Sequence, residues 1–191
     1  ACLIGCTLLL FAGWELIIIG ALCVLFAFLY TTGPYPLSYN GWGDVLVIIF
    51  FGFVPVGGTY YVQALTWTPD VTIASIICGL LIDTLLVVNN YRDREADARS
   101  GKRTVIVRFG EKFGRYFYLL LGISASLLCL YFLREGHIYA ALLPQLYLVP
   151  HVLTWRRMVK IHSGKKLNSI LGETSRNMLF MGILLAIGMI L

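Results

Sequence analysis

Residues 75–104 read SIICGLLIDTLLVVNNYRDREADARSGKRT, and this stretch decides the fold class of the chain. Its first half is apolar, with Asp83 as its one charged residue, as expected of a helix that spans a lipid bilayer. Its second half is a dense run of carboxylates, amides and arginines. The stretch therefore predicts a membrane helix with a polar end at the membrane surface, where charged side chains could hold a metal-bound anion beside an apolar pocket.

The rest of the chain has the composition of a membrane protein. Hydrophobic residues make up 59% of it and its mean hydropathy is +0.81, whereas soluble domains are about 45–50% apolar. Apolar stretches that reach or approach the length of a membrane span occur at 14–30, 45–65, 71–88, 116–133, 138–155 and 174–191, after a shorter one at 1–12. We expect an all-α polytopic transmembrane helical bundle with about seven spans, forming a single domain over residues 1–191.

Basic residues occur only in the second half of the chain. Residues 1–91 contain four acids and no Lys or Arg, and residues 92–191 contain all 15 basic residues with the other six acids. Lys and Arg accumulate in cytoplasmic loops of membrane proteins. We therefore assign to the cytoplasmic side the loops at about 31–44, 90–115 and 156–173. This topology accounts for the net charge of +5 without a nucleic-acid partner.

Asn89, Asp93 and Asp97 follow one another at intervals of four residues. If the helix continues for two turns beyond its apolar part, these side chains share one face. Like charges at that spacing repel, and Mg²⁺ would offset the repulsion because it is typically held by one or two carboxylates together with substrate phosphates. The sequence predicts a Mg²⁺ site at these three residues, with Asp93 and Asp97 as the catalytic pair.

Three cations accompany this predicted metal site. Arg92, Lys102 and Arg103 are close enough in sequence to bind the remaining charge of a diphosphate. Gly101 is a candidate helix C-cap that would turn the Lys-Arg pair back toward the carboxylates. The alternative reading is a solvated helix face. It explains neither the membrane border nor Asp83, which either lines a cavity or has a hydrogen-bonded structural role.

Three segments together resemble the UbiA-type aromatic prenyltransferases, in the form of the 1,4-dihydroxy-2-naphthoate polyprenyltransferases. NNYRDREADARSGKRTVIVRFG (89–110) is similar to the second aspartate-rich motif of that family. LYTTGPYPLSYNGWGDVLVIIFFGFVPVGGTYYVQ (29–63) resembles the block around its fourth and fifth helices, and LNSILGETSRNMLFMGILLAIG (167–188) resembles the start of its last helix. The order and separation of the three segments match the family.

The resemblance implies nine helices around a lipid-accessible cavity, with two aspartate-rich cytoplasmic motifs whose Mg²⁺ ions bind an isoprenyl diphosphate. The first motif and the first two helices have no counterpart here, so the chain is expected to be a fragment that is inactive alone. The implied activity is Mg²⁺-dependent transfer of a polyprenyl group from polyprenyl diphosphate to 1,4-dihydroxy-2-naphthoate in menaquinone biosynthesis. The implied location is the cytoplasmic (inner) membrane of a bacterium, among membrane lipids and with the site facing the cytoplasm. The prenyl chain length and oligomeric state stay open.

The same resemblance implies a substrate pocket. An allylic cation needs electron-rich walls, and aromatic faces supply them, so Tyr60 and Tyr61, with Gln63 near the far end of a span, are the best candidates. Tyr30, Asp44 and Asp83 complete the predicted set. Many relatives carry a basic residue after the tyrosine in the 31–44 loop, whereas TTGPYPLSYNGWGD has none.

Two other functions stay open at this point. The aromatic acceptor could be homogentisate or 4-hydroxybenzoate. From a different class, the paired aspartates could bind the coupling cation of a membrane transporter, although transporter sites usually lie near the bilayer midplane. A non-catalytic scaffold would leave the dense polar segment unexplained.

Overall fold

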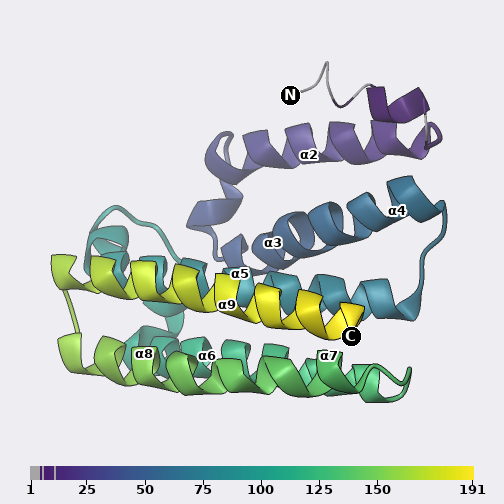
Figure 1. Ribbon diagram of the computed structural model, residues 1–191. Coiled ribbons are helices and arrows are strands. Elements are labelled where there is room, and N and C mark those ends of the chain that lie inside the picture. The colour runs from purple at the N-terminus through teal and green to yellow at the C-terminus, as the bar shows by residue number, and fades with distance from the viewer. Residues whose placement is uncertain (1–4, 6, 11) are drawn as a thin grey trace.

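The computed structural model describes residues 5, 7–10 and 12–191, and within this part every regular element is helical. Long helical segments run side by side in alternating directions, so that the described chain forms an up-and-down bundle (Figure 1). The elements in chain order are η1 (Leu8–Leu10), α2 (Glu15–Thr31), η2 (Leu37–Tyr39), α3 (Gly43–Val47), η3 (Ile48–Gly57), α4 (Gly58–Ala64), α5 (Pro69–Arg99), α6 (Val105–Leu128), η4 (Cys129–Leu133), α7 (Ile138–Leu142), η5 (Leu143–Tyr147), α8 (Leu148–Ile161), η6 (Lys165–Leu167) and α9 (Asn168–Ile190).

The predicted all-α membrane fold is confirmed. By length and composition, helices able to cross a membrane cover Gly43–Ala64, Pro69–Arg99, Val105–Leu133 and Lys165–Ile190. Glu15–Thr31 is a shorter apolar helix. The count of about seven spans stays a prediction, because the predicted first stretch, 1–12, lies partly outside the described residues.

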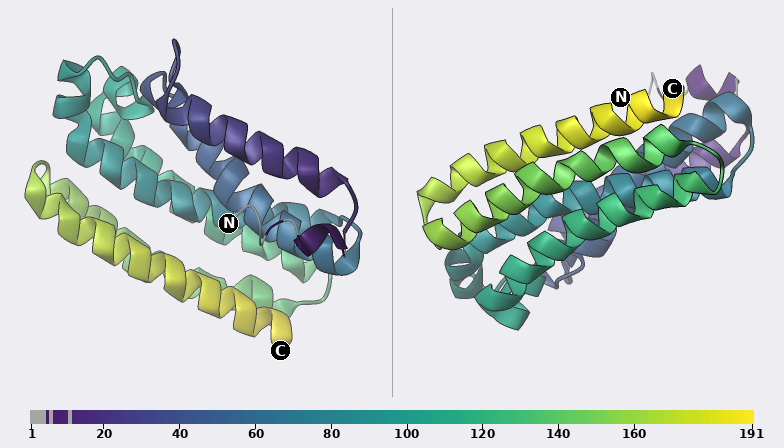
Figure 2. Two further views of the ribbon diagram at one scale, coloured as in Figure 1. Left: turned by 90° about the horizontal axis from the view of Figure 1, so that it is seen from above. Right: turned by 60° about the horizontal axis from the view of Figure 1, so that its bottom comes forward.

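The helix α5 is the centre of the bundle. It contacts η3, α3, α6 and α9, and Figure 2 shows α9 and α2 on opposite sides of it. Glycines allow the closest approach: a Cβ atom on Gly52 would lie 2.9 Å from the Cα of Gly79, and one on Gly79 would lie 2.9 Å from the Cα of Ile48. This contact fixes the α3–η3 segment against the apolar part of α5.

Pro55 lies within η3, a π-helical segment between α3 and α4. Proline has no N–H to donate and clashes with the preceding helical turn. A wider π turn accommodates such a residue without ending the helix. Gly43–Ala64 therefore stays one continuous helical segment.

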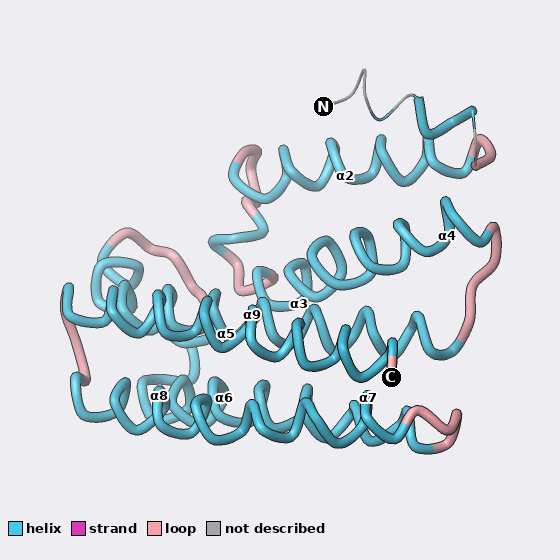
Figure 3. The backbone as a smooth tube through the Cα atoms, in the orientation of Figure 1, coloured by secondary structure: helices cyan, strands magenta, loops and turns pink. Residues whose placement is uncertain are grey.

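The loops predicted to share one side of the membrane lie at the same end of the bundle, on the left of Figures 1 and 3. They are shorter than predicted, because α5 continues to Arg99 and α6 begins at Val105, which leaves only residues 100–104 between them. Thr104 explains the early start of α6, since its Oγ1 accepts a hydrogen bond from the N–H of Val107 at 3.2 Å and so caps the helix. That this end faces the cytoplasm stays a prediction.

Candidate active site

The polar end of α5 holds Asn89 and Asp93 on one face, with Arg92 bound to both. The Arg92 Nη2 atom donates to Asn89 Oδ1 at 2.8 Å. The same guanidinium forms a two-point contact with the Asp93 carboxylate, at 2.8 Å from Nε and 2.6 Å from Nη2. Such a paired contact fixes both side chains more firmly than a single hydrogen bond does. The predicted diphosphate ligand Arg92 is thus engaged with a predicted metal ligand.

A residue from the last helix joins this group. Arg92 Nη1 donates to the Oδ1 atom of Asn168 at 2.9 Å, and Asn168 is the first residue of α9. The spacing of residues along α5 could not reveal this contact, because 76 positions separate the two residues. The available signal was the 167–188 segment, which resembles the family but indicates no role for any single residue.

The end of α5 is closed by a Schellman-type cap that positions the next cation. Gly101 has φ +76°, and the N–H of Lys102 donates to the carbonyl of Asp97 at 2.9 Å. This turn brings Lys102 Nζ to 3.4 Å from the Asp97 carboxylate. The predicted return of the chain at Gly101 is therefore confirmed, and it places a lysine beside the second aspartate.

The 31–44 loop, which has no basic residue of its own, lies against the segment that follows α5. The N–H of Arg103 donates to the Tyr39 carbonyl at 2.7 Å, and Arg108 Nη2 donates to the Asn40 carbonyl at 2.7 Å. Gly41, with φ +80°, lies so close that a Cβ atom there would be 3.0 Å from the Arg103 carbonyl oxygen. Among the described residues, the side chain of Arg103 has neither an ion pair nor a hydrogen bond, so it is free to bind an anion.

A second ionic cluster, centred on Glu111 of α6, fixes the positions of the helix ends. Its carboxylate accepts a hydrogen bond from Tyr91 at 3.2 Å and pairs with Arg94 at 3.2 Å, and it also pairs with Arg115. His162, just after α8, places its Nε2 3.1 Å from the same carboxylate. These contacts join α5, α6 and the residue that follows α8 next to the predicted metal site.

Sequence analysis did not assign a role to Asn90, a member of a polar stripe on α5. Asp83, Asn90 and Asp97 are seven residues apart, which is close to two full helical turns. Asp83 is fully buried and Asn90 is 4% exposed. The stripe runs from the metal-site end into the apolar part of the helix. The seven-residue spacing of these three polar residues is visible in the sequence and could have revealed the stripe.

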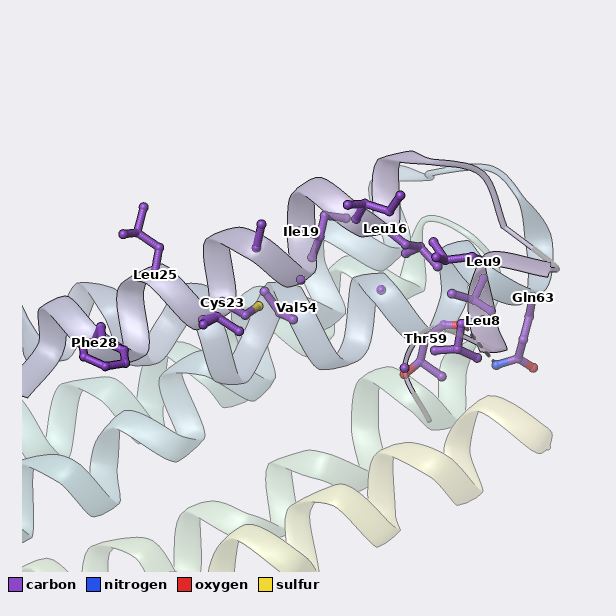
Figure 4. A pocket seen from close by; sticks show the side chains of 17 residues that line it. Leu8, Leu9, Leu16, Ile19, Cys23, Leu25, Phe28, Val54, Thr59 and Gln63 are labelled. Atoms are coloured by element: carbon purple, nitrogen blue, oxygen red, sulfur yellow. Dashed lines mark hydrogen bonds between the residues drawn. The ribbon is translucent and has the colours of Figure 1, made fainter. Parts of the chain in front are cut away.

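The predicted pocket residues fall into two groups. Tyr60, Tyr61 and Gln63 belong to α4, which lies at the opposite end of the bundle from the connection between α5 and α6 (Figure 1). Of these, Gln63 lines an apolar cavity of about 1100 Å³ between α2 and α4, where it lies with Thr59 at one end (Figure 4). The residues Tyr30, Asp44 and Asp83 come together much nearer to the polar end of α5. The structure therefore does not join the predicted pocket residues into one site.

The residues at the end of α5 would provide only part of the ligand set of a Mg²⁺ ion. In the described part of the chain, no three His, Cys, Asp or Glu side chains converge on a common point. The predicted set has two carboxylates and one amide, and the buried Asp97 Oδ2 atom has Lys102 Nζ at 3.4 Å but no hydrogen-bond partner in the described chain. Mg²⁺ usually takes one or two carboxylates and completes its shell with phosphate oxygens and water, so the set suits a metal that arrives with a phosphorylated ligand.

The UbiA prenyltransferase family matches residues 1–189. The chain belongs to this family. The helical bundle of this UbiA-family chain is thus a recognised membrane fold. No solved structure matches the chain at a significant level.

Curated relatives of this UbiA-family chain carry informative names. The 1,4-dihydroxy-2-naphthoate octaprenyltransferase of Escherichia coli is 40% identical over 114 residues, which are 60% of this chain and 37% of the relative. The protein of the same name in Mycobacterium tuberculosis is 40% identical over 126 residues, 65% of this chain and 43% of the relative. The UbiA prenyltransferase domain-containing protein 1 of Dictyostelium discoideum is 30% identical over 173 residues, 91% of this chain and 51% of the relative. The chain thus covers about half or less of each relative's length.

Proposed function

We propose that the full-length protein containing this chain transfers a polyprenyl group from polyprenyl diphosphate to 1,4-dihydroxy-2-naphthoate in a membrane. The observation that carries the proposal is the end of α5, where two aspartates and an amide lie among cations at the border of an apolar bundle. The names of the curated relatives support the choice of acceptor.

The residues at this end would divide the work of binding the diphosphate. Asn89, Asp93 and Asp97 would hold Mg²⁺, and the chemistry that this ion supplies when bound is neutralisation of the departing diphosphate. Lys102 and Arg103 would contact the phosphate oxygens directly, since charge gathered on a leaving group stabilises the transition state most where water is excluded.

Arg92 would have a double role in the same step. Its three hydrogen-bond partners are Asn89, Asp93 and Asn168, and the first two are proposed metal ligands. When the metal and diphosphate bind, the guanidinium would move from the carboxylate to a phosphate oxygen, a partner of the same charge and geometry. It therefore keeps Asp93 neutralised while no substrate is bound.

The apolar parts of the substrates need apolar surroundings. The cavity of about 1100 Å³ between α2 and α4 is lined by side chains such as Leu16, Val24, Phe28 and Val54, which suit an isoprenoid tail. No side chain of the protein needs to act as a nucleophile, because the electron-rich ring of the acceptor attacks the allylic carbon. The carboxylate of the ring would leave as CO₂ from the carbon that gains the prenyl group.

The test uses the full-length protein in membranes with radiolabelled polyprenyl diphosphate. Each candidate acceptor is supplied in turn: 1,4-dihydroxy-2-naphthoate, homogentisate and 4-hydroxybenzoate. We expect a prenylated product with the naphthoate only, and its loss when EDTA removes divalent ions. Product with another acceptor alone would overturn the acceptor assignment. Cation-coupled uptake into vesicles without any prenylated product would favour a transporter.

A further inference from the structure

The last helix brings one polar side chain to the proposed metal site. Asn168 is the first residue of α9, and its Oδ1 atom accepts a hydrogen bond from Arg92 Nη1 at 2.9 Å. Within the described chain it is the one partner of this guanidinium outside α5, since Asn89 and Asp93 belong to the same helix as the arginine. Asn168 therefore ties the position of the guanidinium to a second helix.

Apolar packing holds the start of α9 against the polar end of α5. Leu167 lies just before Asn168 and Ile170 just after it, and both are fully buried. They belong to the same apolar cluster as Tyr91 of α5, and α5 contacts both η6 and α9. Because buried side chains fix the backbone on both sides of Asn168, the fold itself presents this amide to the guanidinium.

The two edges of the Arg92 guanidinium have different partners. Nε and Nη2 contact the Asp93 carboxylate, at 2.8 and 2.6 Å, and Nη2 also donates to Asn89 at 2.8 Å. Nη1 donates to Asn168. The Nε–Nη2 edge thus contacts only proposed metal ligands in the described chain, and Nη1 contacts α9. When Asp93 and Asn89 turn to a metal ion, the Nε–Nη2 edge loses its partners, whereas the Nη1 contact stays.

We propose that Asn168 is a positioning residue, which holds Arg92 by Nη1 while the other edge of the guanidinium moves from the Asp93 carboxylate to the diphosphate. This inference rests on the proposed function, which supplies the diphosphate. The end of an arginine is planar and rigid, so with Nη1 fixed the Nε–Nη2 edge can turn only about that point. The edge therefore stays beside the site, and less conformational freedom is lost when the diphosphate binds.

The other two cations of the site have no such contact with a second helix. Lys102 lies 3.4 Å from the Asp97 carboxylate of α5, and the Arg103 side chain has no ion pair in the described chain. Both residues belong to the short connection that follows α5. A change at Asn168 should therefore act on diphosphate binding through Arg92 alone.

The test measures equilibrium binding of radiolabelled inorganic diphosphate, in the presence of Mg²⁺, to the full-length protein in nanodiscs. Asn168→Leu keeps the approximate size of the side chain but removes the acceptor oxygen. We expect it to raise the Kd about fivefold to tenfold, because a hydrogen bond to a charged group is lost. Ser175→Ala, about two turns further along α9, is the matched control. It should keep the wild-type Kd, since the Ser175 hydroxyl donates to the Leu171 carbonyl of its own helix at 3.0 Å.

A double-mutant cycle separates positioning of Arg92 from a general effect on the fold. Arg92→Leu should raise the Kd about tenfold or more. Adding Asn168→Leu to this variant should change the Kd further by about twofold or less, because the effects of two residues that act through one contact are not additive. Asn168→Ala repeats the cycle with a smaller side chain, and the thermal unfolding midpoint of each variant checks that it is folded.

Two results would overturn the inference. One is a wild-type Kd in Asn168→Leu, and the other is an equal fold-change from Asn168→Leu in the presence and absence of the Arg92 side chain. In both cases the wild type would still bind diphosphate and form product, so the proposed function would stand. If the wild type itself did not bind diphosphate with Mg²⁺, the proposed function would fail, and this inference with it.

Discussion

The molecule contains two pairs of aspartates whose surroundings are opposite. Asp93 and Asp97, at the end of α5, are partly exposed and are each paired with a cation, Arg92 and Lys102. Asp44 and Asp83, deeper in the bundle, are buried, and no cation of the described chain reaches them. We call these the rim pair and the deep pair.

The contrast teaches how one residue type can serve two purposes. A carboxylate near mobile cations keeps its negative charge and can exchange those cations for a metal ion. Two carboxyl groups buried in apolar surroundings without a cation beside them are instead costly to keep ionised. The rim pair therefore suits the ionic leaving group, whereas the deep pair has no cation in the described chain that would keep it charged.

The largest effect is expected from removing a negative charge from the rim pair. In the full-length protein, Asp93→Asn or Asp97→Asn should reduce turnover about 100-fold or more, because a charge that neutralises the diphosphate is lost. The thermal unfolding midpoint should stay within a few degrees of the wild type, since each variant keeps the shape of the side chain. Product formation at the wild-type rate by both variants would exclude the metal role, and Asp70→Asn serves as the control.

The next effect is expected from moving the two helical segments that carry the deep pair apart, with no change to the rim pair. Gly79→Ala places a Cβ atom 2.9 Å from the Ile48 Cα, and forcing the helices apart should cost about 1–3 kcal/mol of stability. The control is Gly182→Ala in α9, where nothing lies within 4 Å. This change should be neutral or stabilising by up to about 1 kcal/mol. Thermal unfolding in detergent compares the two, and equal midpoints would refute the close contact.

A third prediction tests the cations that lie next to the rim pair. Arg103→Gln removes a cation that has no partner within the described chain, and it should raise the KM for polyprenyl diphosphate about tenfold through loss of a charged hydrogen bond. Arg99→Gln removes an exposed arginine from the last turn of α5 and should change the KM about twofold or less. If the two variants behave alike, Arg103 contributes only to the general positive charge of this end.

The smallest expected effect concerns stability. Replacing both members of the deep pair, Asp44→Asn with Asp83→Asn, should leave the free energy of unfolding within about 1 kcal/mol of the wild type, because burying an acid pair is costly in itself. Chemical denaturation in detergent measures it. A loss of several kcal/mol would mean that the deep pair stabilises the fold.

The sequence allowed much of the rim to be predicted. The four-residue spacing of Asn89 and Asp93 predicted the face on which Arg92 contacts both, and the glycine at 101 predicted the returning lysine, because both depend on local helix geometry. Asn168 could not be found in this way, since its contact with Arg92 depends on where α9 packs. The predicted pocket residues do not lie together for the same reason, since Gln63 belongs to α4 at the far end of the bundle and Tyr30 lies near the deep pair.

The sequence by itself determined that the chain is a helical membrane bundle and that its charged chemistry lies at the end of one helix. Apolar length, the absence of basic residues before Arg92 and the four-residue spacing are local properties, and they persist in any packing of the helices. Only the tertiary structure decided that Asp44 lies near Asp83 and that the 31–44 loop lies against Arg103. Both depend on how closely two distant helices approach, which the glycines permit but no single segment can specify.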